Sequence, residues 1–253
     1  MPRKARERSI TGIYHIMMRG INRQNIFEDE EDCERFIQAL KQYKEKCGYK
    51  IYAYCLMGNH LHILMKVGNE PLEQIMRRIC GSYVYWYNWK YGRIGNLFQD
   101  RFKSEPVEND IYFLTVMRYI HQNPIKAGIS AKVEDYKWSS YSEYISKPKV
   151  ADIIFALNLF NSDSQKAIDQ FIRHHSVSNK DSCLDIEGRN RLTDTGARKI
   201  INQEFKMKSP TDLQEIDPAT RNFILKQLKQ KHGLSTRQLG RLTGISRRVI
   251  LKS

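Results

Sequence analysis

The sequence predicts an α+β fold, namely a ferredoxin-like antiparallel sheet with helices on one face, followed by an all-α C-terminal region with a helix-turn-helix. Segments with strand and helix periodicity follow one another in the order β-α-β-β-α between residues 11 and 91. A turn of two residues joins the second and third strands, which therefore pair antiparallel. Beyond residue 216 the pattern is helical.

The three predicted strands are short segments rich in β-branched and aromatic residues. They cover residues 11–19, 50–57 and 60–67. Gly58 and Asn59 separate the last two strands. Asn-Gly is the more favourable order in a hairpin, so the type of this turn stays open.

The first two helices are marked by their charges and by apolar residues spaced three and four apart. Residues 29–48 begin with acidic side chains, become rich in lysine and end at Gly48, an order that the helix dipole favours. The second helix is predicted from Pro71 to Tyr91, with the proline in its first turn. Its aromatic side chains have helical spacing, which favours a place in the core over contact with nucleic acid.

A third helix is predicted over residues 109–122, after a loop or short strand at 92–107. Asn109 is a suitable N-cap for it. The helix is expected to stop near Asn123, because Pro124 disfavours helical geometry at the residue before it.

The chain is expected to contain three regions. Residues 1–146 hold the candidate catalytic residues, residues 147–215 form a helical connector of unknown role, and residues 216–253 form a basic region with a helix-turn-helix pattern. No chemistry is expected in the connector, where helical segments and polar loops follow one another without a clear motif.

The C-terminal region has the pattern of two short helices around a glycine turn. Ser235 is a suitable N-cap for the first helix, and Gly244 lies in the turn. Arg247 and Arg248 enter the second helix and are candidate DNA contacts. Two interpretations fit: a DNA-binding helix-turn-helix, or a helical hairpin that packs on the rest of the protein.

The charge of the chain favours a polyanionic partner. The formal net charge is +14, the isoelectric point is near 9.5, and residues 221–253 contain nine Lys or Arg and no acidic residue. Nucleic acid, an anionic membrane and a merely soluble basic protein all fit this balance. The cysteines are scattered without C-x-x-C spacing, and no signal peptide or membrane-spanning apolar run is present. A cytoplasmic protein that binds no membrane is expected.

Two histidines flank one leucine in the third predicted strand. Because side chains alternate along a strand, His60 and His62 project from one face while Leu61 projects from the other. Two neutral imidazoles on a rigid strand can bind a divalent cation. Taken alone, an H-x-H pattern is weak evidence, because surface or core histidines explain it more often than a metal site.

A tyrosine and an asparagine lie one turn apart in the third predicted helix. Tyr119 and Asn123 are four residues apart and share a helix face. A phenol beside a metal ion can ionise and attack phosphorus, while the carboxamide oxygen can complete the ligand shell. The alternative is an ordinary half-buried aromatic residue, since the chain has 14 tyrosines.

Five motifs in this order resemble the HUH single-tyrosine transposases, in the branch associated with repetitive extragenic palindromes (REP-associated tyrosine transposases). They are YHIMMRG, GNHLHILM, FQDRF, YIHQNPIKAG and DYKWSSY, and the resemblance covers about residues 8–145. The sequence departs at Phe98, where this branch often has tryptophan before the glutamine. No catalytic assignment depends on that position.

The resemblance implies a metal-dependent nickase and strand transferase that acts on single-stranded or hairpin-flanking DNA. By this resemblance, His60, His62 and Asn123 bind Mg²⁺ or Mn²⁺. Tyr119 attacks the backbone and forms a covalent 5′-phosphotyrosine, which a second 3′-OH can reverse. The general base stays unassigned, because His121 lies two residues from Tyr119 on another helix face. The oligomeric state is expected to be a monomer or a homodimer.

Two basic residues near the candidate site are further DNA contacts to test. Arg101 and Lys103 follow FQD in a segment expected to lie beside the metal site, where phosphate contacts are needed. A non-catalytic DNA-binding regulator that uses the C-terminal helix-turn-helix is the alternative function, but all four candidate catalytic residues are present. An RNA-binding module is disfavoured, because the strands lack the aromatic pattern of such sheets.

Overall fold

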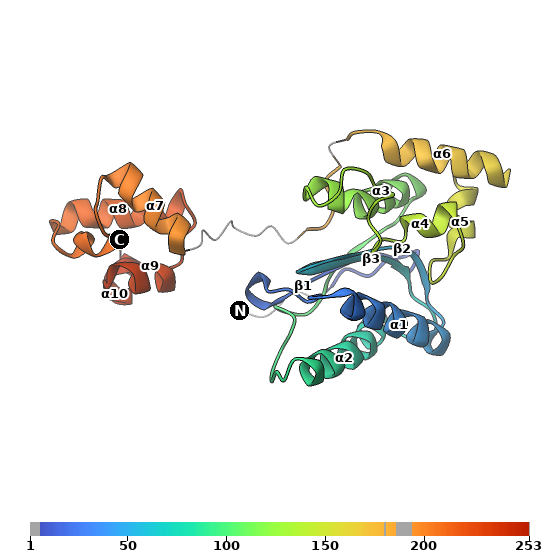
Figure 1. Ribbon diagram of the computed structural model, residues 1–253, viewed down its shortest axis with the longest axis horizontal. Coiled ribbons are helices and arrows are strands. Elements are labelled where there is room, and N and C mark those ends of the chain that lie inside the picture. The colour runs from blue at the N-terminus through green and yellow to red at the C-terminus, as the bar shows by residue number, and fades with distance from the viewer. Residues whose placement is uncertain (1–5, 180, 186–193, 253) are drawn as a thin grey trace. The chain divides into compact units, whose positions relative to one another are not determined.

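The computed structural model describes residues 6–179, 181–185 and 194–252 (Figure 1). It divides into two compact units, Met1–Ile186 and Glu187–Ser253. This division does not coincide with the predicted boundaries at 146 and 215, and the described residues of 147–215 are shared between the two units. Helices in the first part of that segment pack on the core of the first unit, and helices in its last part pack in the core of the second. The two units are described separately.

The first unit is built on a four-stranded antiparallel sheet. Its strands lie in the order β2-β3-β1-β4, with bounds β1 Ile13–Arg19, β2 Lys50–Met57, β3 His60–Lys66 and β4 Lys103–Pro106. The three strands predicted from sequence are confirmed, and β4 is the short strand foreseen after the second helix. Along the chain the order is β1-α1-β2-β3-α2-β4, the split βαβ arrangement of ferredoxin-like folds.

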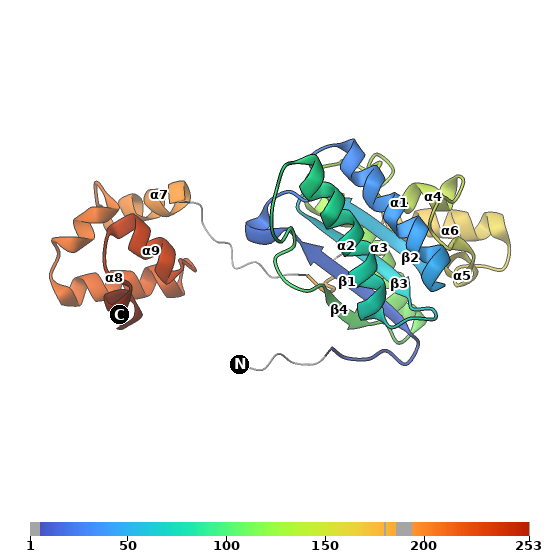
Figure 2. The same ribbon diagram turned by 90° about the horizontal axis from the view of Figure 1, so that it is seen from below.

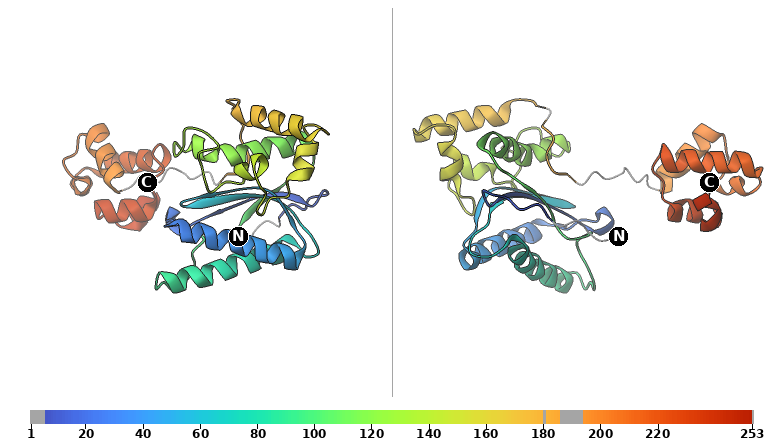
Figure 3. Two further views of the ribbon diagram at one scale, coloured as in Figure 1. Left: turned by 45° about the vertical axis from the view of Figure 1, so that its right-hand side comes forward. Right: turned by 180° about the vertical axis from the view of Figure 1, so that it is seen from behind.

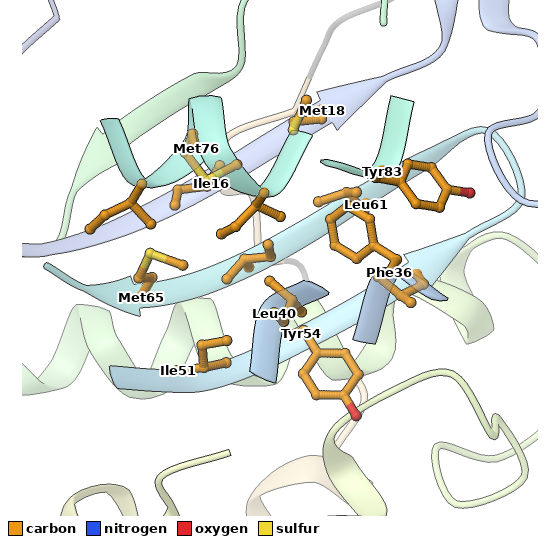
Figure 4. Close-up of a cluster of buried hydrophobic side chains, with 14 of the residues drawn as sticks. Ile16, Met18, Phe36, Leu40, Ile51, Tyr54, Leu61, Met65, Met76 and Tyr83 are labelled. Atoms are coloured by element: carbon orange, nitrogen blue, oxygen red, sulfur yellow. The ribbon is translucent and has the colours of Figure 1, made fainter. Parts of the chain in front are cut away.

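Two helices cover one face of the sheet, α1 (Glu30–Cys47) and α2 (Leu72–Lys90), and Figure 2 shows them side by side across the strands. Asp29 caps α1, and Gly48 ends it in the left-handed region at φ 67°, where a side chain would be strained. Figure 4 shows the apolar core between these helices and the strands. Two aromatic residues of α2, Tyr83 and Tyr87, are buried in it, as their spacing predicted.

Helices also cover the other face of the sheet, so the prediction of helices on one face is wrong. The helices on this side are α3 (Asp110–Lys126), α4 (Tyr141–Ile145), α5 (Ile153–Asn158) and α6 (Ser164–Ser176) (Figure 3). The physical reason lies in the strands, which are apolar at both alternating sets of positions. Ile13, Ala53 and Leu64 face α3 and are buried there together with its apolar residues.

The third helix runs through Pro124, although the sequence predicted that it would stop before this residue. Proline removes one backbone donor, and packing of the last turn compensates for this loss. Pro124 is buried, and so is Gln122, whose side-chain amide donates to the carbonyl oxygen of His175 at 2.7 Å. Tertiary contacts therefore override the local preference.

The second unit is entirely helical in its described residues. Its elements are α7 (Asp194–Phe205), a 3₁₀ turn at Pro210–Gln214, α8 (Pro218–Gln230), α9 (Thr236–Thr243) and α10 (Arg247–Lys252). As predicted, the Ser235 side chain caps α9, and Gly244 forms the turn to α10 at φ 72°. The unit has its own apolar core, which includes Leu228 and Leu239. Its use as a DNA-binding helix-turn-helix stays a prediction.

Candidate functional site

The two predicted metal ligands lie together on the α3 face of β3. The ring centroids of His60 and His62 are 5.3 Å apart, with the rings nearly perpendicular. His62 is fully buried, whereas His60 is partly accessible. Leu61 between them is buried in the core on the opposite face. The prediction that both imidazoles share one face is therefore confirmed.

Each imidazole uses its Nδ1 atom within the protein. His60 Nδ1 lies 2.6 Å from the side-chain oxygen of Asn59, and His62 Nδ1 lies 3.0 Å from Nε2 of His15. His62 Nε2 is buried and has no hydrogen-bond partner in the described part of the chain. A buried nitrogen with a free lone pair is a suitable ligand for a cation.

The imidazoles have the protonation state that metal binding requires. Burial lowers the pKa of His60 to about 4, and it lowers the pKa of His62 well below the ordinary value. Both rings are thus neutral near pH 7. In the described residues, no three side chains of His, Cys, Asp or Glu are grouped to enclose an ion. The two histidines fit an open site that keeps positions for water or substrate oxygens.

The Tyr119 ring packs against the buried histidines. Its centroid lies 5.7 Å from that of His62 and 5.9 Å from that of His15, edge to face in both cases. The Lys126 ammonium lies 4.4 Å from the tyrosine centroid. The structure thus brings the predicted nucleophile and the predicted metal ligands to one place on the sheet, from α3 and β3 respectively.

Asn123 is placed one turn after the tyrosine, as its spacing predicted. It is buried, and its amide nitrogen donates to the carbonyl oxygen of Tyr119 at 3.0 Å. This bond orients the carboxamide and leaves its oxygen to accept another partner or to bind a cation. Its role as a metal ligand stays a prediction.

Comparisons with known proteins point to the same residues. A family model described as "Transposase IS200 like" matches residues 9–123, which include His60, His62 and Tyr119. A Haemophilus influenzae protein whose name assigns it to the REP-associated tyrosine transposases is 24% identical over 119 residues. This match covers 42% of the chain and 66% of the relative, so the chain spans less than two thirds of that relative's length.

A solved structure of a REP-associated tyrosine transposase bound to a REP hairpin is also similar. The match has a TM-score of 0.51 and 19% identity, and it covers 58% of this chain and 87% of the other. At this identity the likeness shows the fold. The resemblance to the REP-associated tyrosine transposases is confirmed.

Two residues of this transposase-like site escaped the sequence analysis. Arg19 pairs with His60 across β1 and β3, so both project from the same face. The period of two in β1 was a signal that could have revealed Arg19. Asp185 lies 3.4 Å from the Arg19 guanidinium and accepts from the Tyr119 hydroxyl at 3.4 Å. No sequence signal pointed to Asp185, which lies where no chemistry was expected.

The phenol of Tyr119 is held in its neutral form. Only 6% of the residue is exposed. Burial, followed by the negative charge of Asp185, raises the pKa of the phenol. Its ionisation therefore needs assistance at neutral pH.

His121 lies away from the site, as its helical position predicted. Its ring is buried, with Nδ1 2.9 Å from His175 Nε2 and Nε2 2.8 Å from the Ser140 hydroxyl oxygen. These contacts place it in the cluster between α3 and α6, which excludes it as the base for Tyr119.

The candidate DNA contacts lie on different surfaces. Lys103 pairs with Met17 in β1 and projects from the same face as the histidines, whereas Arg101 lines a cavity of about 640 Å³ beside α2. Both are exposed, as are Arg247 and Arg248 of the second unit. The expectation that Arg101 and Lys103 line one phosphate path therefore stays a prediction, and Lys103 is the better placed of the two.

No helix in the described residues is both long and apolar enough to cross a membrane.

Proposed function

We propose that the chain is a metal-dependent nickase and strand transferase that acts on single-stranded or hairpin-flanking DNA. One observation carries this proposal: the Tyr119 ring lies 5.7 Å from His62, a buried histidine whose Nε2 has no hydrogen-bond partner in the described residues. A phenol beside a vacant imidazole nitrogen is the arrangement that attack on a metal-held phosphate needs. The solved relative with a REP hairpin supports hairpin DNA as the partner.

His60, His62 and Asn123 would hold the cation, Mg²⁺ or Mn²⁺. When bound, it would polarise the scissile phosphate and stabilise charge on its oxygens. The family-model match over both histidines and the tyrosine supports this assignment. The fit rests on a neutral donor set, because two imidazoles and one amide leave the ion its full charge.

Tyr119 acts as the nucleophile. Its hydroxyl loses its proton, and the phenolic oxygen forms a bond to phosphorus while the bond from phosphorus to the 3′-oxygen breaks. The leaving 3′-oxygen takes up a proton and becomes a 3′-OH, so one proton is lost and one is gained. The products are a 5′-phosphotyrosine and a free 3′ end. The phosphodiester energy is conserved in the new bond, so a second 3′-OH can reverse the step on another strand.

Arg19 and Lys126 supply positive charge near the nucleophile. Lys126 lies over the tyrosine ring, and Arg19 lies beside His60 across the sheet. Both charges favour a bound phosphate and the phenolate form. Asp185 accepts a hydrogen bond from the Tyr119 hydroxyl, and its negative charge opposes the phenolate form.

The proposal is tested by incubating the full chain with single-stranded hairpin oligonucleotides and Mn²⁺ and looking for a covalent adduct on a denaturing gel. The wild type is expected to form the adduct and Tyr119→Phe to form none. Tyr112→Phe is the matched control, because Tyr112 lies two turns earlier in α3. An adduct that survives Tyr119→Phe but is lost in Tyr112→Phe would reverse the assignment.

A further inference from the structure

A series of hydrogen bonds connects three strands and ends at His62, one of the candidate metal ligands. Glu105 of β4 lies 2.8 Å from Nδ1 of His15 in β1, and Nε2 of His15 lies 3.0 Å from Nδ1 of His62 in β3. Glu105 stands directly opposite His15 in the sheet, so this contact is set by the strand register. His15 and His62 are fully buried, so water does not compete for the bond between them, whereas Glu105 is partly exposed.

The chemistry of Glu105 determines which atom donates in the first of these hydrogen bonds. An ionised carboxylate only accepts hydrogen bonds, and Glu105 also accepts the backbone N–H of Leu184 at 3.0 Å through the same oxygen. His15 Nδ1 therefore carries a proton and donates to Glu105. In a neutral ring the other nitrogen of His15 then accepts, so His62 Nδ1 carries the next proton. The consequence is a bare lone pair on His62 Nε2.

The series of hydrogen bonds from Glu105 through His15 ends at His62. His62 Nε2 is buried and has no hydrogen-bond partner in the described residues. His60 is arranged in the same way by a different group, because the side-chain oxygen of Asn59 accepts from its Nδ1 at 2.6 Å. The Asn59 amide nitrogen faces the carbonyl oxygen of Arg23, which supports this orientation of the amide. Each imidazole thus has its Nδ1 proton engaged.

We propose that His15 and Glu105 are positioning residues that hold His62 as the Nδ1–H tautomer and direct its Nε2 lone pair to the cation. The inference rests on the proposed function only for the identity of the cation. Acceptors behind metal-bound histidines fix the tautomer and the ring orientation, and their loss commonly weakens metal binding by about 10–100-fold. His15 does not bind the ion itself, because both its nitrogens are already used.

A purely structural role for His15 makes a different prediction. A buried hydrogen-bonded histidine can stabilise the sheet without affecting the proton on its neighbour. His121 is such a residue, since it is buried and both its nitrogens are bonded to groups other than His62. His121→Phe is therefore the matched control for His15→Phe: both remove a buried imidazole, but only one removes the acceptor behind His62.

The experiment measures the tautomer of His62 by long-range ¹H–¹⁵N NMR on the full chain, labelled with ¹⁵N-histidine and free of metal, together with the Kd for Mn²⁺ by titration calorimetry. In the wild type and in His121→Phe, His62 is expected to carry its proton on Nδ1. In His15→Phe the proton is expected to redistribute between the two nitrogens, and the Kd to rise about 10–100-fold. Glu105→Gln, which keeps an oxygen acceptor, is expected to have a smaller effect and serves if His15→Phe does not fold.

Three results would overturn the inference. They are a wild-type His62 protonated on Nε2, a Kd for Mn²⁺ that is the same in folded His15→Phe or Glu105→Gln as in the wild type, and no Mn²⁺ binding by the wild type. Failure of the nickase proposal is distinguishable, since it would appear as no DNA adduct from a chain with the expected tautomer and Mn²⁺ affinity.

Discussion

The two faces of the sheet bury side chains of different chemistry. On the face covered by α1 and α2, Ile16, Leu61 and Ile63 form an apolar core. On the face covered by α3, the same strands place His15 and His62 among apolar neighbours. Adjacent residues of one strand thus serve stability on one side and a reactive site on the other. The difference indicates that the sheet holds the site rigidly because its opposite face is packed mainly by apolar side chains.

The largest expected effect comes from a pair of neighbouring substitutions on opposite faces. His62→Ala is expected to abolish Mn²⁺-dependent adduct formation even by the folded fraction, because it removes a ligand, and to cost some stability, because it also removes the buried partner of His15. Leu61→Ala is expected to lower the free energy of unfolding by about 2–5 kcal/mol and to leave adduct formation by the folded fraction intact. Urea denaturation and adduct gels on both variants measure these effects. Equal losses of activity and stability in the two variants would break the comparison.

The pH dependence of stability is the second test. Burial lowers the pKa of His60 to about 4 and that of His121 to about 3, whereas an unfolded histidine has a pKa of about 6.5. Below pH 6.5 the unfolded state therefore binds more protons than the folded state. The free energy of unfolding is expected to be nearly constant between about pH 7 and 8 and to fall steadily as the pH decreases towards 4. A urea midpoint that is unchanged between pH 7 and pH 5 would contradict this expectation.

Removal of the second unit is expected to affect binding more than chemistry. A chain that ends at Asp185 keeps the residue bonded to Tyr119 and loses the nine basic residues of 221–253. Weaker DNA binding and a flatter salt dependence are expected, by about 0.7 in slope for each lost contact with single-stranded phosphate. Nicking of a saturating short substrate is expected to persist. A full-length salt slope in the truncated chain would show that these residues do not contact DNA.

The smallest effect separates the two basic residues near β4. Lys103 projects from the histidine face, whereas Arg101 lines the cavity beside α2. Lys103→Ala is expected to weaken binding of a short single strand and to reduce the salt slope by about 0.7, the value for one contact. Arg101→Ala is expected to have less effect on the same substrate. Fluorescence anisotropy at several salt concentrations measures both effects. A larger loss of DNA binding in Arg101→Ala than in Lys103→Ala would contradict this assignment.

Much of the fold was predictable because it follows from local patterns. The bounds of β2 and β3 match the two predicted strands almost to the residue, and Gly48 ends α1 as expected. The extent of α3 was not predictable, because the turn at Pro124 is held by contacts with His175, which is distant in sequence. The coverage of the second sheet face was missed although the strands themselves carried the signal.

The site was predictable where one element determines it. His60 and His62 share a face because a strand alternates, and Tyr119 and Asn123 share one because a helix repeats. Asp185 contacts Tyr119 although the two residues are 66 positions apart in the sequence, and no local pattern predicts such a contact. The bonds from His15 to Glu105 and to His62 depend on the register of three strands, which the sequence alone did not determine.

Identification of the residue that becomes attached to DNA tests the central claim most directly. The wild-type chain is incubated with a hairpin oligonucleotide and Mn²⁺, digested with nuclease and trypsin, and analysed by tandem mass spectrometry. The account predicts a nucleotide linked through its 5′-phosphate to Tyr119. A nucleotide linked to Tyr112 or to any other side chain, or strand cleavage without any linked nucleotide, would contradict it.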